Sequence, residues 1–201
     1  MRLLVLARIA VILAAVAASS AAASISAQAS RSRFCGLERW PVKTLTDPAA
    51  VSVNFRLVAS TVDRLRRLRV PRVRARTPRI RVVETTTYRI RVRLLAMKRE
   101  PDHDIHLVVA SPRTGRTMIV EFPDRRCTAG AVRRRQMTAA RAAIERACGR
   151  PPTMFFRRLT GSATITGVGL VDTIHGQKGI APNGIELHPA LAFTPASCRR
   201  A

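Results

Sequence analysis

The chain has 201 residues and a formal net charge of +24, with 36 lysine and arginine residues against 12 acidic residues. This charge attracts polyanions such as nucleic acid, anionic lipid or acidic wall polymers. Aromatic residues make up only 4% of the chain, which argues against a surface that stacks the bases of single-stranded nucleic acid. Arginine supplies 33 of the basic residues, as GC-rich coding also produces, so the charge alone does not establish a specific ligand.

The first 29 residues have the pattern of a secretory signal peptide. Arg2 and Arg8 form a basic start, residues 9–18 are apolar, and Ala27-Gln28-Ala29 fits a cleavage site. The alternative is a membrane anchor, because no charge occurs between Ile9 and Ser30. The three-part pattern favours a cleaved signal, which predicts a secreted or cell-envelope protein. No later apolar run is long enough to span a bilayer, so we expect no stable membrane span after cleavage.

Four cysteines follow this leader, namely Cys35, Cys127, Cys148 and Cys198. An even number in an exported chain predicts two disulfide bonds, and the spacings match no zinc motif. Three pairings are open. We prefer Cys127–Cys148, which would close a loop around one helix, together with Cys35–Cys198, which would join the two ends of the mature chain.

Residues 30–85 form an arginine-rich segment with little regular patterning. Apolar residues at three-residue spacing in 62–68 predict a short helix that Pro71 ends. Twelve arginines occur in the 30 residues from 64 to 93. A charge run of this kind is usually a solvated face, and the alternative is an arm that lies on a polyanion.

Residues 86–201 are predicted to form the main domain. Alternating polarity and turn residues predict strands over 88–95, 105–110, 117–122, 163–170 and 185–193. An apolar stripe predicts a helix over 131–148. Three strands, a helix and two strands is the order of the OB-fold, a five-stranded Greek-key barrel. We therefore expect a mainly β (α+β) fold, an OB-fold-like barrel with one helix between the third and fourth strands.

Several blocks of the chain resemble a family of uncharacterised exported proteins of actinobacteria. They are ERWPVKTLTD (38–47), DIHLV (104–108), MIVEFP (118–123) and TGVGLVDTIHGQKGIAPNGIELHP (166–189). The last block carries the pattern HGQxGxAPNxIELHP and is the strongest part of the resemblance. The resemblance implies an exported protein with the OB-fold-like barrel, and it implies no activity and no catalytic role.

Strand phase places five polar side chains toward one wall of the predicted barrel. Asp104 and His106 share a face of the second strand, Glu121 lies on the third, and Glu186 and His188 share a face of the fifth. In this fold the third strand lies between the second and the fifth. Two histidines and three carboxylates would therefore converge. The opposing interpretation is that Glu186 and His188 face solvent or form cross-strand pairs.

The loop before the last strand adds three further candidate binding residues, His175, Gln177 and Asn183. Imidazole and carboxylate groups suit Zn²⁺, Mn²⁺ or Fe²⁺, and the same groups suit general acid–base work near neutral pH. The candidate metal ligands are His106, Glu186 and His188, and the candidate catalytic bases are His175 and Asp104.

Two functions are compatible with these features. The first is a non-catalytic binding module for a polyanion, either extracellular nucleic acid or acidic cell-wall polymer, which requires no cofactor. The alternative is a metal-dependent hydrolase of phosphoesters that uses the histidine and carboxylate cluster with a divalent ion. A third interpretation is an exported domain with a protein partner and no chemistry of its own. The mutual distances of the cluster residues distinguish these alternatives.

Overall fold

A computed structural model describes residues 34–36 and 38–201 of the chain, and Cys35–Ala201 forms one compact unit. The predicted signal peptide, with its anchor alternative, lies outside the described residues. Within the described part, no helix is both long enough and apolar enough to cross a membrane.

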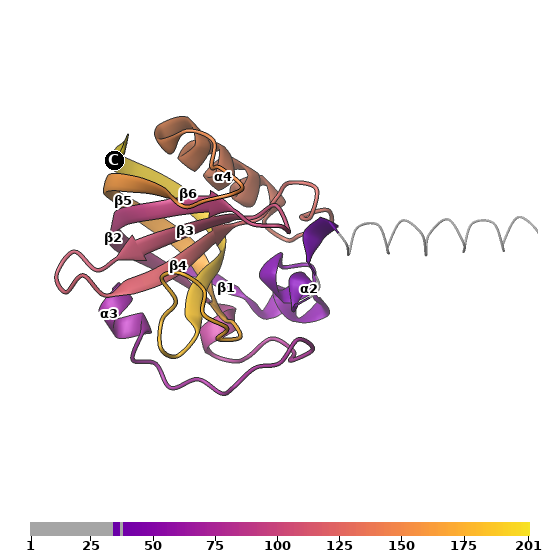
Figure 1. Cartoon of the computed structure of the whole chain (residues 1–201). Coiled ribbons are helices and arrows are strands. Elements are labelled where there is room, and N and C mark those ends of the chain that lie inside the picture. Colours follow the sequence, from indigo (N-terminus) through magenta and orange to yellow (C-terminus); the bar gives the residue numbers. More distant parts are fainter. Residues whose placement is uncertain (1–33, 37) are drawn as a thin grey trace, which may run out of the picture. The chain divides into compact units, whose positions relative to one another are not determined.

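The described chain is mainly β, with a single six-stranded sheet and a few helices (Figure 1). The strands are β1 (Asn54–Ala59), β2 (Thr86–Arg99), β3 (Ile105–Ala110), β4 (Thr117–Phe122), β5 (Arg157–Val171) and β6 (Ile185–Arg200). The α-helices are α2 (Trp40–Lys43), α3 (Val62–Leu65) and α4 (Arg134–Cys148), and Pro48–Ser52 and Val83–Thr85 form 3₁₀ helices.

The strands β2 to β6 close into a ring. The order in the sheet is β1-β2-β3-β4-β6-β5, and β2 pairs with β5 as well. The pair β4–β6 is parallel, and the other pairs within the ring are antiparallel. The strand β1 adds to β2 in parallel outside the ring, so the sheet has one strand more than predicted. The sequence did not indicate β1, because five of its six residues are exposed and it carries no apolar alternation.

The core fills the inside of the ring. On β2 the apolar residues Ile90, Val92 and Leu94 are buried, while Arg91 and Arg93 between them are exposed, which confirms the predicted alternation. The helix α4 packs against β6 (Figure 1). It buries the apolar stripe predicted for it, at Met137, Ala140 and Ile144. Full burial of each large aliphatic side chain stabilises the fold by about 1.5–3 kcal/mol.

The arginine-rich N-terminal segment is packed more tightly than its sequence indicated. The guanidinium of Arg39 donates to both carboxylate oxygens of Glu84, at 2.7 and 2.6 Å, and to the carbonyl of Val171 at 2.6 Å. Arg79 forms an ion pair with Asp47 at 2.5 Å. Both arginines are buried. The interpretation of the arginine run from 64 to 93 as a solvated face is therefore wrong for Arg79, which connects distant parts of the N-terminal segment.

The two disulfide bonds are present, but the preferred pairing was wrong. Cys35 is bonded to Cys127 and Cys148 to Cys198, with Cα–Cα distances of 5.6 and 5.4 Å. The helix α4 explains the difference, because its 15 residues span about 22 Å and separate its C-terminal Cys148 from the loop that holds Cys127. Instead, Cys148 meets β6 alongside the helix. Two disulfides in the described chain are consistent with an extracellular protein.

Candidate functional site

Five polar side chains converge on the outer face of β3, β4 and β6, opposite the core. Asp104 immediately precedes β3, His106 lies on β3, Glu121 on β4, and Glu186 and His188 on β6. The register places His106 directly beside Glu121. The residues that alternate with them belong to the core of the ring, namely Ile105, Leu107, Val120, Phe122, Ile185 and Leu187. The phase of the strands, read from the sequence, therefore places these five residues together.

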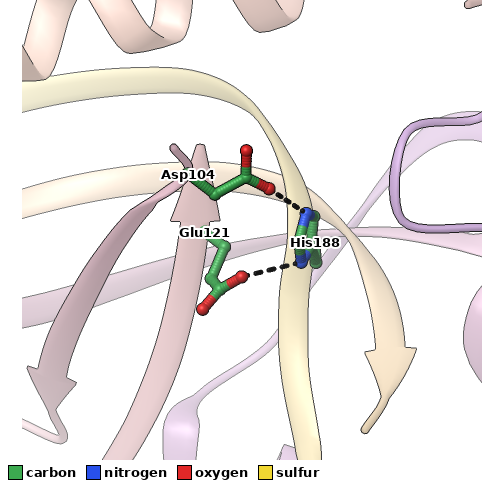
Figure 2. Close-up of side chains that lie close together, drawn as sticks. All are labelled: Asp104, Glu121 and His188. Carbon is green, nitrogen blue, oxygen red and sulfur yellow. Dashed lines mark ion pairs between the residues drawn. The ribbon is translucent and has the colours of Figure 1, made fainter. Parts of the chain in front are cut away.

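The imidazole of His188 lies at the centre of the cluster. Figure 2 shows this ring between the carboxylates of Asp104 and Glu121. Its Nδ1 atom lies 3.1 Å from Glu121 Oε2 and 3.2 Å from Glu186 Oε1, and its Nε2 atom lies 3.2 Å from Asp104 Oδ2. The second oxygen of Glu121 lies 3.1 Å from His106 Nδ1. One carboxylate therefore contacts both imidazoles.

The two ring nitrogens of His188 differ in their hydrogen bonding. Nδ1 has the geometry of a hydrogen bond to Glu186. Nε2 lies within ion-pair distance of Asp104, but the contact lacks hydrogen-bond geometry, and Nε2 is buried without a hydrogen-bond partner among the described residues. The side chain is 0% exposed, so water outside the fold does not reach this nitrogen. A buried nitrogen in this state is available to a ligand.

His106 is held on both sides of its ring. Its Nε2 atom donates to the backbone carbonyl of Lys178 at 2.9 Å, while Nδ1 faces Glu121. The ring of Phe156 contacts it edge-on, with ring centroids 5.2 Å apart. Burial lowers the pKa of His106, but the contact with Glu121 outweighs burial and raises the pKa above its ordinary value. Both nitrogens of His106 are thus occupied within the protein.

The side chains of the cluster shift one another's pKa values. Burial lowers the pKa of His188, yet its contacts with Asp104, Glu121 and Glu186 raise it well above the ordinary value. Burial and the neighbouring charge of Glu121 raise the pKa of Glu186 to about 7. Burial raises the pKa of Glu121, but the two imidazoles lower it more, so that this carboxylate stays ionised. The cluster therefore contains more carboxylates than its imidazoles neutralise.

Two segments cover the cluster on the side away from the core. The Nζ atom of Lys43, at the end of α2, lies 3.1 Å from Asp172 Oδ2 and has a largely buried side chain. Burial lowers the pKa of Lys43, but Glu186, Glu121 and Asp172 raise it more, so this lysine remains charged. The loop between β5 and β6 approaches so closely that a Cβ on Gly179 would lie 2.5 Å from a methyl group of Val108.

Acidic residues are concentrated around His188. Half of the chain's 12 acidic residues gather here, and four basic groups of the described residues lie among them. The acidic residues are Glu100, Asp102, Asp104, Glu121, Asp172 and Glu186, and the basic groups are Lys43, Lys98, His106 and His188. Burial, followed by the charges of Asp104 and Glu121, raises the pKa of Asp102 to about 7. In a chain with so large a positive charge, this buried surplus of carboxylates is a local exception that a cation would neutralise.

The structure does not bring the three predicted loop residues to the cluster. His175 is exposed, and its backbone N–H donates to Gln177 Oε1 at 2.9 Å. The amide of Gln177 in turn donates to the carbonyl of Thr173. Asn183 donates to two carbonyl oxygens of the segment 65–68. These side chains hold the loop, and the described contacts give His175 no role as a base at His188.

Sequence reasoning missed further groups near the cluster, among them Lys43, Asp102 and Asp172. Asp102 carried a usable signal, because it continues the two-residue spacing of Asp104 and His106. Lys43 is one of only three lysines in a chain with 33 arginines, but nothing in the sequence indicated its neighbours. Asp172 directly follows β5, where a polar residue is ordinary.

The geometry defines a possible cation site. One ligand atom from each of Asp104, Glu121 and His188 lies within 4.8 Å of the other two. An imidazole with two carboxylates is a donor set for divalent transition metals. Comparison of the chain with models of protein families, with curated proteins and with solved structures found no match.

Proposed function

We propose that this chain is an exported domain that binds one divalent transition-metal ion through Asp104, Glu121 and His188. The observation that carries the proposal is the buried Nε2 atom of His188, which has no hydrogen-bond partner among the described residues and lies 3.2 Å from Asp104 Oδ2. Ligand atoms about 2.0–2.2 Å from a tetrahedral ion are about 3.3–3.6 Å apart. The Nε2 and Oδ2 atoms therefore lie nearly at the spacing that an ion requires. Glu121 Oε2 lies 3.1 Å from Nδ1, on the other side of the ring, and has to approach Nε2 to bind the same ion.

The opposite nitrogen of His188 supports the same assignment. A metal-bound histidine usually donates its second N–H to a carboxylate, which fixes the ring and its tautomer. The Nδ1 atom of His188 is hydrogen bonded to Glu186 at 3.2 Å. In this account Glu186 orients the ligand rather than binding the ion, which differs from the sequence-based choice of His106, Glu186 and His188 as ligands.

The donor set indicates Zn²⁺, Mn²⁺ or Fe²⁺ rather than a softer ion. It contains nitrogen and oxygen atoms and no sulfur, since all four cysteines are in disulfide bonds. Hydrolysis would further require an open coordination position and a path for substrate. The three proposed ligands are at most 8% exposed, which favours a closed metal site over the phosphoesterase alternative.

The fold that we propose for the ring is the OB-fold. The ring of β2 to β6 and the position of α4 between its third and fourth strands support this assignment. The block 166–189, which resembles exported actinobacterial proteins, supplies Glu186 and His188. We propose that export and this family relationship apply to the chain.

A second candidate function is the binding of a polyanion at the protein surface. The observation that favours it is the row formed by Arg89, Arg91 and Arg93, all exposed on one face of β2. Because these charges lie on the surface, they would act independently of the buried cluster. The two functions are therefore compatible in one protein.

The metal proposal is tested by titrating protein purified without a histidine tag. After removal of bound ions, Zn²⁺ and Mn²⁺ are added in a calorimeter to the wild type and to the variants His188→Gln and His175→Gln. We expect one ion per chain for the wild type and for His175→Gln, since His175 is exposed. The His188→Gln variant loses a ligand, and we expect its affinity to fall by at least about 100-fold, at the upper end of losses from outer-shell changes.

A wild type without stoichiometric binding, or a His188→Gln variant that binds equally well, contradicts the proposal. If His188→Gln fails to fold by circular dichroism, Asp104→Asn replaces it, because this change preserves size while weakening one ligand. A phosphoesterase assay on the metal-loaded wild type tests hydrolysis separately. Turnover that disappears in His188→Gln would support the alternative of a catalytic site.

A further inference from the structure

A cavity lined by arginines lies between β2, α3 and the turn that joins β3 to β4. Its volume is about 630 Å³. Two of its arginines, Arg89 and Arg91, come from β2, while Arg67 follows α3 and Arg113 lies in the turn. All four are exposed. The cavity thus brings together basic side chains from three separate parts of the chain.

The local structure fixes where these side chains stand. Arg89 and Arg91 alternate with the core residues of β2, so they lie on one face, about 6.8 Å apart along the strand. Thr164 on β5 pairs with Arg91 across the sheet and lines the same cavity. On the near side, Ser60 adds a further hydroxyl group. Strand geometry therefore presents guanidinium and hydroxyl donors in one direction.

The single carboxylate of the cavity is already engaged. Asp63 accepts hydrogen bonds from the hydroxyl of Ser111 at 2.6 Å and from that of Thr114 at 2.5 Å. These bonds connect α3 to the turn and hold both sides of the cavity together. Side-chain hydrogen bonds from Ser111 and Thr114 lower the pKa of Asp63, so the carboxylate stays ionised and accepts these bonds.

The arginines themselves are almost without partners. Arg113 lies 3.8 Å from Asp63 with a side chain that is 77% exposed, which makes a weak ion pair. For Arg67, Arg89 and Arg91 the described part of the chain provides neither an ion pair nor a hydrogen bond to the guanidinium group. Four guanidinium groups against one engaged carboxylate leave a local excess of positive charge with open donors.

From these observations we infer that the cavity is the site at which the chain binds the phosphate groups of a phosphodiester polyanion. The inference rests on the second candidate function, the binding of a polyanion, and gives it a place and a chemistry. A guanidinium group donates two parallel hydrogen bonds to phosphate oxygens. The hydroxyl groups of Ser60 and Thr164 add donors of a kind common in phosphate contacts.

The test measures binding of a thymidine oligonucleotide to the full chain over a range of salt concentrations. The pocket variant is Arg89→Gln/Arg91→Gln. The matched control is Arg134→Gln/Arg135→Gln, which removes the same charge from exposed positions of α4 outside the cavity. We expect the pocket variant to lose at least about 10-fold in affinity at 0.1 M salt. The slope of log K against log salt, which is negative, becomes shallower by about 1.4, since each of the two lost phosphate contacts on a single strand contributes about 0.7.

The control variant is expected to bind within about threefold of the wild type, with an unchanged slope. Equal losses of affinity in both variants would contradict a binding site in the cavity and would indicate that the charge of the whole surface attracts the oligonucleotide. A wild type that does not bind the oligonucleotide overturns the second candidate function itself, which separates the two failures. A polyglutamate probe of equal length is expected to bind more weakly than the oligonucleotide, and equal binding contradicts the preference for phosphate.

Discussion

At the scale of single residues, His188 connects the chemistry of the buried cluster. Its ring touches three carboxylates, and its Nε2 atom has no hydrogen-bond partner among the described residues. The proposed ion would supply the positive charge that protons on these side chains supply in its absence. Without an ion, the cluster has to retain protons in order to stay folded.

This requirement predicts how the stability of metal-free protein depends on pH. The pKa of Glu186 and that of Asp102 are raised to about 7, and those of both cluster histidines are raised as well. Between pH 5 and pH 8 the folded state therefore binds more protons than the unfolded state. The free energy of unfolding then decreases as the pH rises. Glu121, whose pKa is lowered, contributes a constant stabilisation throughout this window.

Urea unfolding in the presence of a chelator measures this effect. We expect the free energy of unfolding of the wild type to decrease from pH 5 to pH 8, and Glu186→Gln to show a smaller decrease because its side chain does not titrate. Glu38→Gln, at an exposed position, serves as the control with a wild-type profile. A wild type whose stability is constant or increases over this range contradicts the assigned protonation.

The residue scale also shows what the sequence could reveal of the site. Alternation along β3 and β6 is a property of any strand, so it predicted that Asp104 and His106 share a face, as do Glu186 and His188. The approach of Lys43 depends on how the N-terminal segment folds over the sheet, which no local pattern encodes. His175 was chosen for its residue type, and its exposed position in a loop was not predictable from strand phase.

At the scale of elements, the segment before β2 covers the outer face of the ring. Arg39, Glu84 and Val171 join α2, the turn before β2 and the end of β5 in one buried network. Leu45, Ala50 and others form a small apolar cluster with Met137 of α4. The sequence of this segment shows little regular pattern, because the contacts that stabilise it join residues that lie far apart in the chain.

Removal of one partner of this network is expected to destabilise the whole unit. Glu84→Ala leaves the guanidinium of Arg39 buried and unpaired, and breaking a buried ion pair in this way costs about 3–5 kcal/mol. The control Glu38→Ala changes an exposed carboxylate and should stay within about 0.5 kcal/mol of the wild type. Chemical denaturation measures both. A loss below about 1 kcal/mol for Glu84→Ala would show that this network is not needed to hold the segment.

At the scale of the whole molecule, the order of the ring strands and the place of α4 were predictable from turn spacing and periodicity. A closed arrangement of these strands was expected as well, and the ring agrees with it. The extra strand β1 and the disulfide pairing were not predicted, because each depends on contacts between distant parts of the chain. The bond Cys148–Cys198 fastens α4 to β6, and Cys35–Cys127 fastens the covering segment to the loop after β4.

The disulfides are therefore expected to contribute strongly to stability. Their cysteines are 50 and 92 residues apart, and loops of these lengths correspond to about 4 and 4.6 kcal/mol in the chain-entropy estimate. The variants Cys148→Ser/Cys198→Ser and Cys35→Ser/Cys127→Ser should each lose free energy of unfolding, the second slightly more. Peptide mapping under non-reducing conditions checks the pairing, and a Cys127–Cys148 peptide would contradict it.

The central claim is that a divalent ion lies beside His188, and anomalous diffraction tests it most directly. Crystals of the protein soaked with Zn²⁺ would be measured on both sides of the zinc absorption edge. The account predicts one strong anomalous peak about 2.0–2.2 Å from ligand atoms of Asp104, Glu121 and His188. Crystals with no peak in the cluster, or with peaks only at exposed histidines such as His175, would contradict it.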